Sequence, residues 1–537
     1  MLQRPMAWVA DNRLIAAGLA LVLVAVVAAV AILANRTPHT SSTLANPSQT
    51  ASGSVEPGSS SGPGTSAGAA TSAPGVGQAT GGSEVRGGGF TQIPGLSNTP
   101  KAQSCRAQSV KATGVTDKTI TVGQVVTDSN QLPQQLGPAH DGLNAFVKLF
   151  NAAGGLCGRT LKLDYRNDNL NPATHRSDMQ ELAGSTFAFV ANESLLDFLD
   201  YGQNKPFTPQ VQGGGGYVPD VGGLAFSYNR SQSAWHAGVI GSVSPTLIGG
   251  GQFRSYIQEA KAKGTPCVKA GVIYVDEPTG ASQDEAMLFQ SALEAGWGGN
   301  LGAGNTKLYS ANLVDPEPAY ETLVERMITD GMNCVFTATD VHSNINLVQA
   351  MNNRGAWPPA KCTRAVKTQC FRVVWIPFSA YDSSFVRDGG EGALDVTTFI
   401  PHLPFSEPDA SPMRAYLNAI KGVNGKPSTF SVLGFASGIM FINALQACPA
   451  KPTRDCVMKG LHSMTDFNAG GLLGGTAPFR TTKATYGNYG SVDWKWIFFR
   501  SVNMRVLDRN GKRDFYRISP PSGFFTDTLH VARGTSG

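Results

Sequence analysis

Residues 146–173 read FVKLFNAAGGLCGRTLKLDYRNDNLNPA and contain the end of a helix, a strand and the start of a second helix. Apolar residues at 143, 146, 147 and 150 recur at the spacing of one helical face, which Gly154-Gly155 then ends. Apolar residues alternate over 161–165, as in a strand. Asn171-Pro172 supplies a capping side chain and a proline at the first helical position. The stretch therefore predicts a helix–strand–helix unit.

The same alternation extends in both directions from this stretch. Upstream, 120–126 (ITVGQVV) is a β-branched run that ends in a polar loop. Further strands are predicted at 187–191, 268–275, 334–339 and 373–377, and further helices at 282–295, 318–329 and 341–354. Strands that alternate with helices of this length form βαβ units with parallel sheets. Because the pattern restarts near residue 265, we predict an α/β protein with two doubly wound lobes, whose ligands bind beyond the carboxyl ends of the strands.

The N-terminal 36 residues contain an uncharged stretch of 21 residues, 14–34, bounded by Arg13 and Arg36. About 20 apolar helical residues span the hydrocarbon core of a bilayer. We predict a membrane anchor over residues 1–36, with the N-terminus in the cytoplasm because positive charge precedes the span. The alternative is a cleaved secretory signal, with Ala29-Val30-Ala31 as its cleavage site and a secreted product.

Residues 37–104 are predicted to be a disordered linker. Ser, Gly, Thr, Ala and Pro dominate 37–100, which hold three charged residues, so little side-chain bulk is present to build a core. A flexible chain of this length has a root-mean-square span of roughly 45 Å, which would hold a globular domain away from the lipid surface. The richness in Gly, Ala and Ser is typical of a high-GC, actinobacterial-like source.

All eight cysteines lie beyond the linker, in residues 105–537. An even number of cysteines in an exported domain indicates disulfides. Cys267 and Cys334 each stand at the entry of a predicted strand, and those strands could be neighbours. The expected pairs are Cys105–Cys157, Cys267–Cys334, Cys362–Cys370 and Cys448–Cys456. A metal site is not expected, because no CxxC occurs and the histidines do not cluster with cysteine at ligand spacing.

Charge and motifs argue against two further classes of protein. Residues 105–537 carry 38 basic and 35 acidic residues, without the excess of positive charge that nucleic-acid binding requires. No G-x-S-x-G elbow, no G-x-x-x-x-G-K-[ST] loop and no G-x-G-x-x-G after a strand is present. We predict a protein that is not an enzyme and has no catalytic residue, metal or cofactor. The enzyme alternative is a pair of carboxylates, distant in sequence, that meet for glycoside hydrolysis.

The ordered set of motifs resembles the type I periplasmic binding proteins, specifically the branched-chain amino-acid-binding branch of ABC transporter receptors. The resemblance covers essentially residues 105–535, and it rests on the segments 120–126, 146–173, 268–282 (VKAGVIYVDEPTGAS), 334–340 (CVFTATD), 431–448 (SVLGFASGIMFINALQAC) and 471–496. It implies two Rossmann-like lobes joined by a three-segment hinge. Lobe 1 would comprise about 116–240 and 402–470, and lobe 2 about 241–400 and 471–530.

The resemblance also implies where a ligand would bind. Lobe 1 would offer the loops 128–135, 191–194 and 212–217, and lobe 2 the loops 276–279, 339–342 and 378–382. The candidate ligand-binding residues in these loops are Asp128, Gln135, Asn192, Glu193, Ser194, Gln212, Gly215, Tyr217, Asp276, Thr279, Asp340 and Tyr381. The family binds an amino-acid carboxylate with hydroxyl groups, and Ser194 could serve here.

Several residues depart from that pattern. Glu193 would repel a carboxylate, Gly213–Gly216 replace a hydroxyl, and Thr279 stands where tyrosine is common. Acids, amides and hydroxyls fit a polar ligand with a cationic or hydroxyl-rich part better than an aliphatic amino acid. Some candidates have structural alternatives: Asp276 and Asp340 as exposed or helix-capping residues, and Tyr217 and Tyr381 as packing aromatics.

The predicted function is that of an extracytoplasmic solute-binding receptor. It would capture a small polar ligand, an amino acid or a related solute, by closure of the two lobes about the hinge, and pass it to an ABC permease. The alternative is a membrane-tethered surface receptor or scaffold that uses the same fold in signalling or cell-wall physiology.

Overall fold

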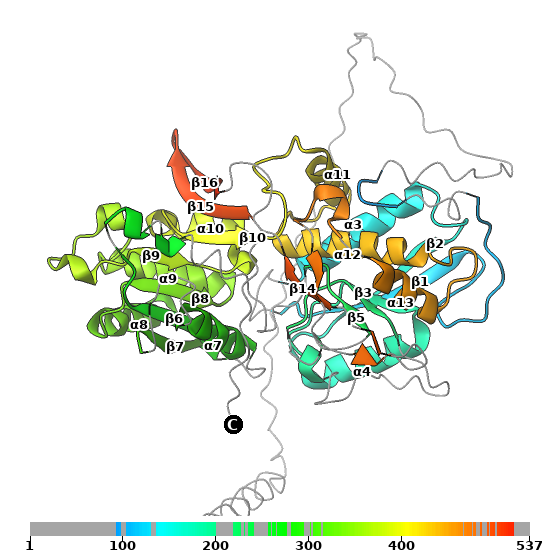
Figure 1. Cartoon of the computed structure of the whole chain (residues 1–537), viewed down its shortest axis with the longest axis horizontal. Coiled ribbons are helices and arrows are strands. Elements are labelled where there is room, and N and C mark those ends of the chain that lie inside the picture. Colours follow the sequence, from blue (N-terminus) through cyan, green and yellow to red (C-terminus); the bar gives the residue numbers. More distant parts are fainter. Residues whose placement is uncertain are drawn as a thin grey trace, which may run out of the picture. The chain divides into compact units, whose positions relative to one another are not determined.

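The computed structural model of the chain describes residues 93–97, 104–129, 136–199, 218–226, 230, 235–240, 256–258, 260–264, 266–276, 281–294, 301, 304–312, 315–464, 467–474, 476–479, 484–485, 491–492, 495–499 and 502–519. In this part of the chain, two parallel-rich sheets carry the main structure (Figure 1).

The first sheet has five parallel strands in the order β2-β1-β3-β4-β5. Its strands are β1 (Thr119–Val126), β2 (Thr160–Asn167), β3 (Ala188–Val190), β4 (Asp220–Val221) and β5 (His236–Ala237). This order reverses direction between β1 and β3, as in doubly wound folds. The carboxyl ends of β1 and β3 therefore form a switch point, where ligands of such sheets bind.

Helices cover both faces of the five-stranded sheet (Figure 1). Helices α3 (Pro138–Ala152), α4 (Pro172–Ser185) and α12 (Thr429–Leu445) pack on the sheet, while α11 (Ser411–Lys421) packs on α3 and α13 (Arg454–Ser463) packs on α12. As predicted, Asn171 caps α4, because its side chain accepts hydrogen bonds from the backbone N–H groups of Ala173 and Thr174. Helix α12 is buried almost all round and packs closely on α3. A Cβ atom on Gly434 would lie 2.1 Å from the carbonyl oxygen of Ala139, so this contact requires glycine.

The second sheet has seven strands in the order β16-β15-β10-β9-β8-β6-β7. Its strands are β6 (Ala270–Asp276), β7 (Thr306–Asn312), β8 (Cys334–Ala338), β9 (Val373–Trp375), β10 (Thr397–Ile400), β15 (Val502–Arg509) and β16 (Lys512–Ser519). Strands β6 to β10 are parallel and repeat the order of the first sheet, with their own switch point between β6 and β8. Strands β15 and β16 add an antiparallel hairpin at the edge.

Helices also connect the strands of the second sheet. They are α7 (Ala281–Glu294), α8 (Glu317–Thr329), α9 (Val341–Asn353) and α10 (Ser383–Asp388), with the 3₁₀ turns η3 (Pro359–Lys361), η4 (Lys367–Gln369), η5 (Phe378–Ala380) and η6 (Gly390–Ala393). Other short elements are η2 (Asp197–Leu199), η7 (Ala469–Gly471), β11 (Thr476–Phe479), β12 (Ala484–Thr485), β13 (Ser491–Val492) and β14 (Lys495–Phe499). Strands β11 and β14 pair with each other, as do β12 and β13.

Two segments that the sequence predicts to cross between lobes run side by side. His402 and Leu473 form an antiparallel bridge. The backbone N–H of Leu403 donates to the carbonyl of Leu472 at 2.9 Å, and that of Gly474 donates to the carbonyl of Pro401 at 2.9 Å. The two crossings are thus joined by backbone hydrogen bonds rather than passing separately. The proposed lobe boundaries near 400 and 470 remain predictions.

The last part of the predicted linker is packed against the domain. Ile93 is 2% exposed and belongs to the core. Asn443 on α12 accepts a hydrogen bond from the N–H of Ser97 and donates one to the carbonyl of Gly95, both at 2.8 Å. Gln446 also donates to the carbonyl of Ser97. The packed part of the chain therefore begins before residue 105, where the sequence placed the end of the linker.

Replacing Gly95 with alanine tests this contact. The φ angle of Gly95 is 86°, and an added Cβ would lie 2.4 Å from the carbonyl carbon of Ala469. The matched control is Gly511→Ala, since Gly511 has a φ of 78° but no atom within 4 Å of an added Cβ. We expect Gly95→Ala to lower the free energy of unfolding by about 1–2 kcal/mol more than the control does. Equal losses in chemical denaturation would show that residues 93–97 do not pack in solution.

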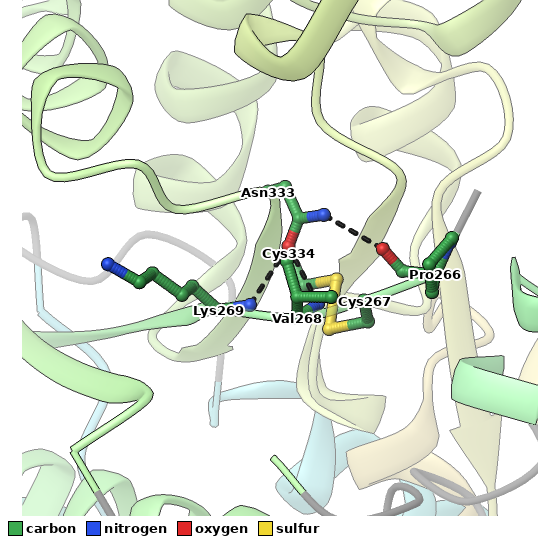
Figure 2. The surroundings of a disulfide bond; sticks show 6 residues. All are labelled: Pro266, Cys267, Val268, Lys269, Asn333 and Cys334. Atoms are coloured by element: carbon green, nitrogen blue, oxygen red, sulfur yellow. Dashed lines mark hydrogen bonds between the residues drawn. A yellow bond between two sulfur atoms is a disulfide. The ribbon is translucent and has the colours of Figure 1, made fainter.

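Four disulfides join the eight cysteines in the pairs expected from the sequence. Cys267–Cys334 links the segment that leads into β6 to the first residue of β8, and Figure 2 shows Asn333 beside this bond. The Asn333 side chain accepts hydrogen bonds from the N–H groups of Val268 and Lys269 and donates one to the carbonyl of Pro266. Disulfide and amide together hold the amino ends of two neighbouring strands in register.

The disulfides predict the behaviour of the exported protein towards thiol reagents. Because no cysteine is free, the chain should take up no alkylating reagent when denatured without reductant, and eight equivalents after reduction. Mass spectrometry of the alkylated chain measures both numbers. Substantial labelling before reduction would contradict the pairing.

None of the helices among the described residues is both long and apolar enough to cross a membrane. The predicted anchor over 14–34 lies outside that part of the chain, and so does the linker up to residue 92.

Candidate functional site

The site begins at the carboxyl end of β1, where Thr127, Asp128 and Ser129 leave the sheet. The N–H of Asp128 donates to the side chain of Asn167 at 3.0 Å, and the Asn167 amide donates to the Asp128 carbonyl at 2.7 Å. The Asp128 carboxylate lies against Gly137, the residue before α3. Burial and the nearby charge of Asp141 raise the pKa of Asp128. This candidate therefore lies at the first switch point, half-buried beside a helix N-terminus.

Chain geometry after β3 brings three further candidates to the same edge. Ala191 has a φ of 56°, which interrupts the regular strand. Asn192 then accepts a hydrogen bond from the N–H of Val125 at 2.8 Å. Glu193 resumes pairing beside β1, since its N–H donates to Val125 and its carbonyl accepts from Thr127. The loop that follows β3 is thus fixed against the end of β1.

Ser194 belongs to a buried polar cluster. Its hydroxyl donates to Asp168 at 2.5 Å and lies 3.2 Å from Nδ1 of His175 and 3.3 Å from the hydroxyl of Thr127. His175 Nδ1 also lies 2.9 Å from Asp168. Burial opposes ionisation of Asp168, but the hydrogen bonds from His175 and Ser194 outweigh it and lower the pKa. The Ser194 hydroxyl is therefore occupied within the protein, and the cluster supports the loop that carries Glu193.

Glu193 is fully buried, with 0% of its surface exposed. The backbone N–H of Leu224 interacts with this carboxyl, but no hydrogen bond of standard length and angle reaches either oxygen from the described residues. Burial raises the pKa of Glu193 well above its usual value, although the charge of Arg230 and the backbone N–H of Leu224 favour ionisation. A buried carboxyl without a hydrogen-bond partner is costly. Glu193 thus supplies unused hydrogen-bonding capacity at the switch point of the first sheet.

Arg230 is the buried counter-charge behind this loop. Its guanidinium makes a two-point contact with Asp220, at 2.9 and 3.1 Å, and lies 3.4 Å from Asp197. It also donates to the carbonyls of Asn192 and Leu224. Asp220 further pairs with His236 at 3.1 Å. Burial disfavours the charge on Asp220, but Arg230 and His236 outweigh it and lower the pKa. The arginine therefore fixes the loops on both sides of Glu193.

The second sheet places further candidates at its own switch point. Asp276 is the exposed last residue of β6. Thr339 follows β8, is 7% exposed, and its hydroxyl has no hydrogen-bond partner among the described residues. Asp340 caps α9, because its carboxylate accepts hydrogen bonds from the N–H groups of His342 and Ser343. Asp340 thus has the helix-capping position that the sequence offered as an alternative to ligand binding.

Tyr381 lies among aromatic side chains next to the paired crossings. It is 4% exposed, its ring stacks on Phe405 at 5.3 Å, and its hydroxyl accepts a hydrogen bond from the N–H of Phe405 at 3.1 Å. Burial raises the pKa of Tyr381. Nearby His402 is also buried, which lowers its pKa to about 4 and leaves it neutral at physiological pH. Tyr381 therefore packs among aromatic side chains, which the sequence offered as an alternative to ligand binding.

The remaining candidates lie outside the described residues. They are Gln135, Gln212, Gly215, Tyr217 and Thr279. Within the described part of the chain, no group of three or more His, Cys, Asp or Glu side chains could hold a metal ion.

One feature unites the switch points of the two sheets. Ser129 after β1, Glu193 after β3 and Thr339 after β8 each bury a polar side-chain atom without a partner among the described residues. Sequence reasoning named Glu193; the predicted loops 128–135 and 339–342 contain Ser129 and Thr339, but neither residue was among the named candidates. A hydroxyl residue within three positions of the end of a buried strand is the signal that could have found them. Buried polar groups normally have hydrogen-bond partners, so these three side chains could form hydrogen bonds with a bound ligand.

Comparisons with known proteins show what this chain is similar to. A family model described as periplasmic binding protein matches residues 119–495. No curated sequence shows significant similarity. An extracellular ligand-binding receptor from Verminephrobacter eiseniae ef01-2 has a TM-score of 0.55 and 14% identity, over 74% of this chain and 99% of that one.

Two further solved structures carry names that refer to ABC transporters. A fatty acid ABC transporter substrate-binding protein from Thermomonospora curvata has a TM-score of 0.54 and 14% identity, over 77% of this chain and 95% of its own. A solute-binding protein of an ABC transporter from Rhodopseudomonas palustris BisB5, in complex with 3,4-dihydroxybenzoic acid, has a TM-score of 0.53 and 14% identity, over 76% and 98%. At these identities the similarity concerns the fold.

Proposed function

Because this chain belongs to the periplasmic binding protein family, we propose that it is a solute-binding receptor that captures a small polar ligand between two lobes. The observation that carries the proposal is the set of unpartnered polar atoms on Ser129, Glu193 and Thr339, at the switch points of both sheets. A ligand held between these edges would supply the missing hydrogen bonds, and closure of the lobes would exclude water from them.

The charges at these edges indicate the class of ligand. Among the described residues of the candidate loops, the acidic ones are Asp128, Glu193, Asp276, Asp340 and Asp382, and none is lysine or arginine. Arg230 lies behind the loop and pairs with Asp220. A ligand carboxylate would meet no counter-charge there, whereas an ammonium group or a set of hydroxyls would find acceptors. We propose a cationic or hydroxyl-rich solute, in contrast to the carboxylic acids named for the Thermomonospora and Rhodopseudomonas proteins.

The proposed setting is the outer face of the cell membrane. The apolar stretch 14–34 and the charges around it support an anchor with a cytoplasmic N-terminus, and the four disulfides suit an oxidising compartment. An ABC permease is the proposed partner. The anchor and the long linker favour a second candidate, a tethered surface receptor that does not feed transport.

Native mass spectrometry of the full chain in detergent tests the proposal. We expect one small molecule bound per chain, released on denaturation and identified by its mass as an amine or a polyol. If the chain is empty, thermal-shift screening of amines, amino acids and sugars provides the second measurement. A bound carboxylic acid without an amine would contradict the proposed ligand class. An empty chain with no stabilising solute would contradict the receptor.

A further inference from the structure

Residues 93–97 form a tight turn against one of the two paired crossing segments. Residues 93–96 read Ile-Pro-Gly-Leu, and the N–H of Leu96 donates to the carbonyl of Ile93 at 3.2 Å, which closes a β-turn. Proline at the second position and glycine with a positive φ, here 86°, at the third are typical of a type II turn. This short sequence therefore specifies its own structure, within a segment predicted to be linker.

The turn packs on η7, which leads into the crossing segment at 471–474. An added Cβ on Gly95 would lie 2.4 Å from the carbonyl carbon of Ala469, and one on Gly470 would lie 2.3 Å from the backbone nitrogen of Gly95. The two backbones therefore touch, with no room for a side chain on either glycine. Ala469, Gly470 and Gly471 have φ angles of 48°, 70° and 90°. A residue such as Ala469 keeps this conformation only where its surroundings hold it.

Helix α12 holds the same turn through hydrogen bonds. Asn443 accepts one from the N–H of Ser97 and donates one to the carbonyl of Gly95, both at 2.8 Å. Gln446, next to the end of the helix, donates to the carbonyl of Ser97. The side chain of Ile93 is 2% exposed and belongs to the core. Residues 93–97 thus connect α12 to the bend at η7.

The bend at η7 passes directly into the paired crossings. Leu472 follows the bend, and its carbonyl accepts a hydrogen bond from the N–H of Leu403 on the other crossing at 2.9 Å. His402 on that crossing lies 3.0 Å, through Nε2, from the hydroxyl of Thr429 at the start of α12. The contacts therefore run from α12 through residues 93–97, η7 and both crossings back to α12. Residues 93–97 are the part of this circuit that belongs to neither predicted lobe.

We propose that residues 93–97 form a strap that controls the movement of the two lobes. When the strap is docked on η7, it holds the crossings in the arrangement described above. When it is released, the crossings open more easily and the lobes reorient more widely. Because the chain reaches the strap from the predicted anchor and linker, a pull on that linker would be transmitted to the crossings. The inference rests on the proposed function, since it takes the crossings as the place where the lobes move.

Hydrogen exchange of the full chain tests the effect of the strap on the crossings. Asn443→Ala removes two hydrogen bonds to the strap, and Ile93→Ser removes its buried apolar side chain; neither residue belongs to a crossing. In both variants the backbone N–H groups of Leu403 and Gly474 should exchange about tenfold faster, because weaker docking of the strap makes local opening less costly. The N–H groups of β8 in the second sheet are the internal reference and should exchange as in the native chain.

Asn418→Ala is the matched control, since Asn418 is an exposed residue of α11, and it should leave exchange at the crossings unchanged. Thermal melting shows whether each variant is folded, and Asn443→Ala alone tests the strap if Ile93→Ser does not fold. Unchanged exchange at Leu403 and Gly474 would overturn the inference. Equally faster exchange throughout the domain would do the same, because the strap would then only stabilise the fold as a whole.

The distance between the lobes provides the second measurement. Dyes attached through non-natural amino acids at two exposed positions, Lys148 on α3 and Lys269 before β6, report this distance by energy transfer in single molecules. The strap variants should broaden the distribution of transfer efficiencies, whereas Asn418→Ala should not. An unchanged distribution in the strap variants would overturn the control of lobe movement. Failure of the receptor proposal, an empty chain that no solute stabilises, would leave both measurements intact, so the two failures can be told apart.

Discussion

Replacing Arg230 with methionine should destabilise the folded protein by about 3–5 kcal/mol at neutral pH, which is the usual cost of removing one partner from a buried ion pair. Arg230 is 1% exposed and makes a two-point contact with Asp220, which is 0% exposed. Methionine fills much of the same volume but leaves Asp220 and Asp197 without this cation. Equilibrium unfolding of the full chain in urea measures the loss. The loops carrying Asn192 and Leu224 also lose a donor.

The effect of Arg230→Met should depend on pH. In the native protein the pKa of Asp220 lies below its unfolded value, so the stabilisation is present above the unfolded pKa, about 4, and is lost as pH falls towards the folded pKa. In the variant, His236 still lowers the pKa of Asp220, but burial is opposed less, so that pKa should lie higher than in the native protein. The difference between the two proteins should therefore be largest near pH 7 and shrink below about pH 4.

A matched control removes a guanidinium that is not buried. Arg387 is largely exposed and pairs with its neighbour Asp388, so Arg387→Met should leave the free energy of unfolding unchanged. A loss below about 1 kcal/mol in Arg230→Met, comparable to an ordinary surface change, would show that Arg230 does not balance the buried carboxylates.

Much of the fold follows from local signals in the sequence. The family resemblance and the α/β class are confirmed, because helical and strand periodicities, the Asn171-Pro172 helix start and the order of the motifs each reflect short-range physics. The predicted helix over 341–354 agrees within a residue with α9 (Val341–Asn353). The strands β7 and β10 were not predicted, since β7 has polar residues at its exposed positions and β10 has only four residues.

The C-terminal hairpin was also missed, although a local signal exists for it. Asn510-Gly511 connects β15 and β16, with φ angles of 58° and 78° that suit a tight hairpin turn. An Asn-Gly pair between two alternating runs is a strong hairpin signal. The surrounding charged residues, which place the strands at a sheet edge, obscured the alternation.

For the candidate site too, some features could be predicted from the sequence and others could not. Strand ends can be located from sequence, so Asp128, Glu193 and Asp340 were placed at the correct edges of their sheets. Whether a side chain is free or occupied depends on partners distant in sequence. Ser194 is engaged by Asp168 and His175, and no local pattern reveals that contact.

Glu193→Gln should make the protein less sensitive to alkaline pH. The folded pKa of Glu193 is raised above its unfolded value, so its stabilising effect is complete below the unfolded pKa and is lost as pH rises through the folded pKa. Glutamine has a similar shape and does not ionise. Relative to the native chain, the variant should gain about 1.4 kcal/mol of stability for each pH unit until the folded pKa is reached. Identical pH dependence of unfolding in the two proteins would mean that Glu193 is ionised when folded.

Substitution of Glu193 should weaken ligand binding even where it increases the stability of the fold. Once the ligand is identified, Glu193→Gln and Glu193→Ala should weaken its binding about tenfold to a hundredfold while the domain remains folded, because each removes a carboxyl that no described residue satisfies. Glu181→Gln is the control, since Glu181 is 61% exposed and pairs with Arg166. A cationic ligand should also release a proton on binding, because a positive charge beside Glu193 lowers its pKa. Calorimetry in buffers of different ionisation enthalpy detects that proton. Unchanged affinity in both Glu193 variants would remove this residue from the site, even if the pH dependence of stability is as expected.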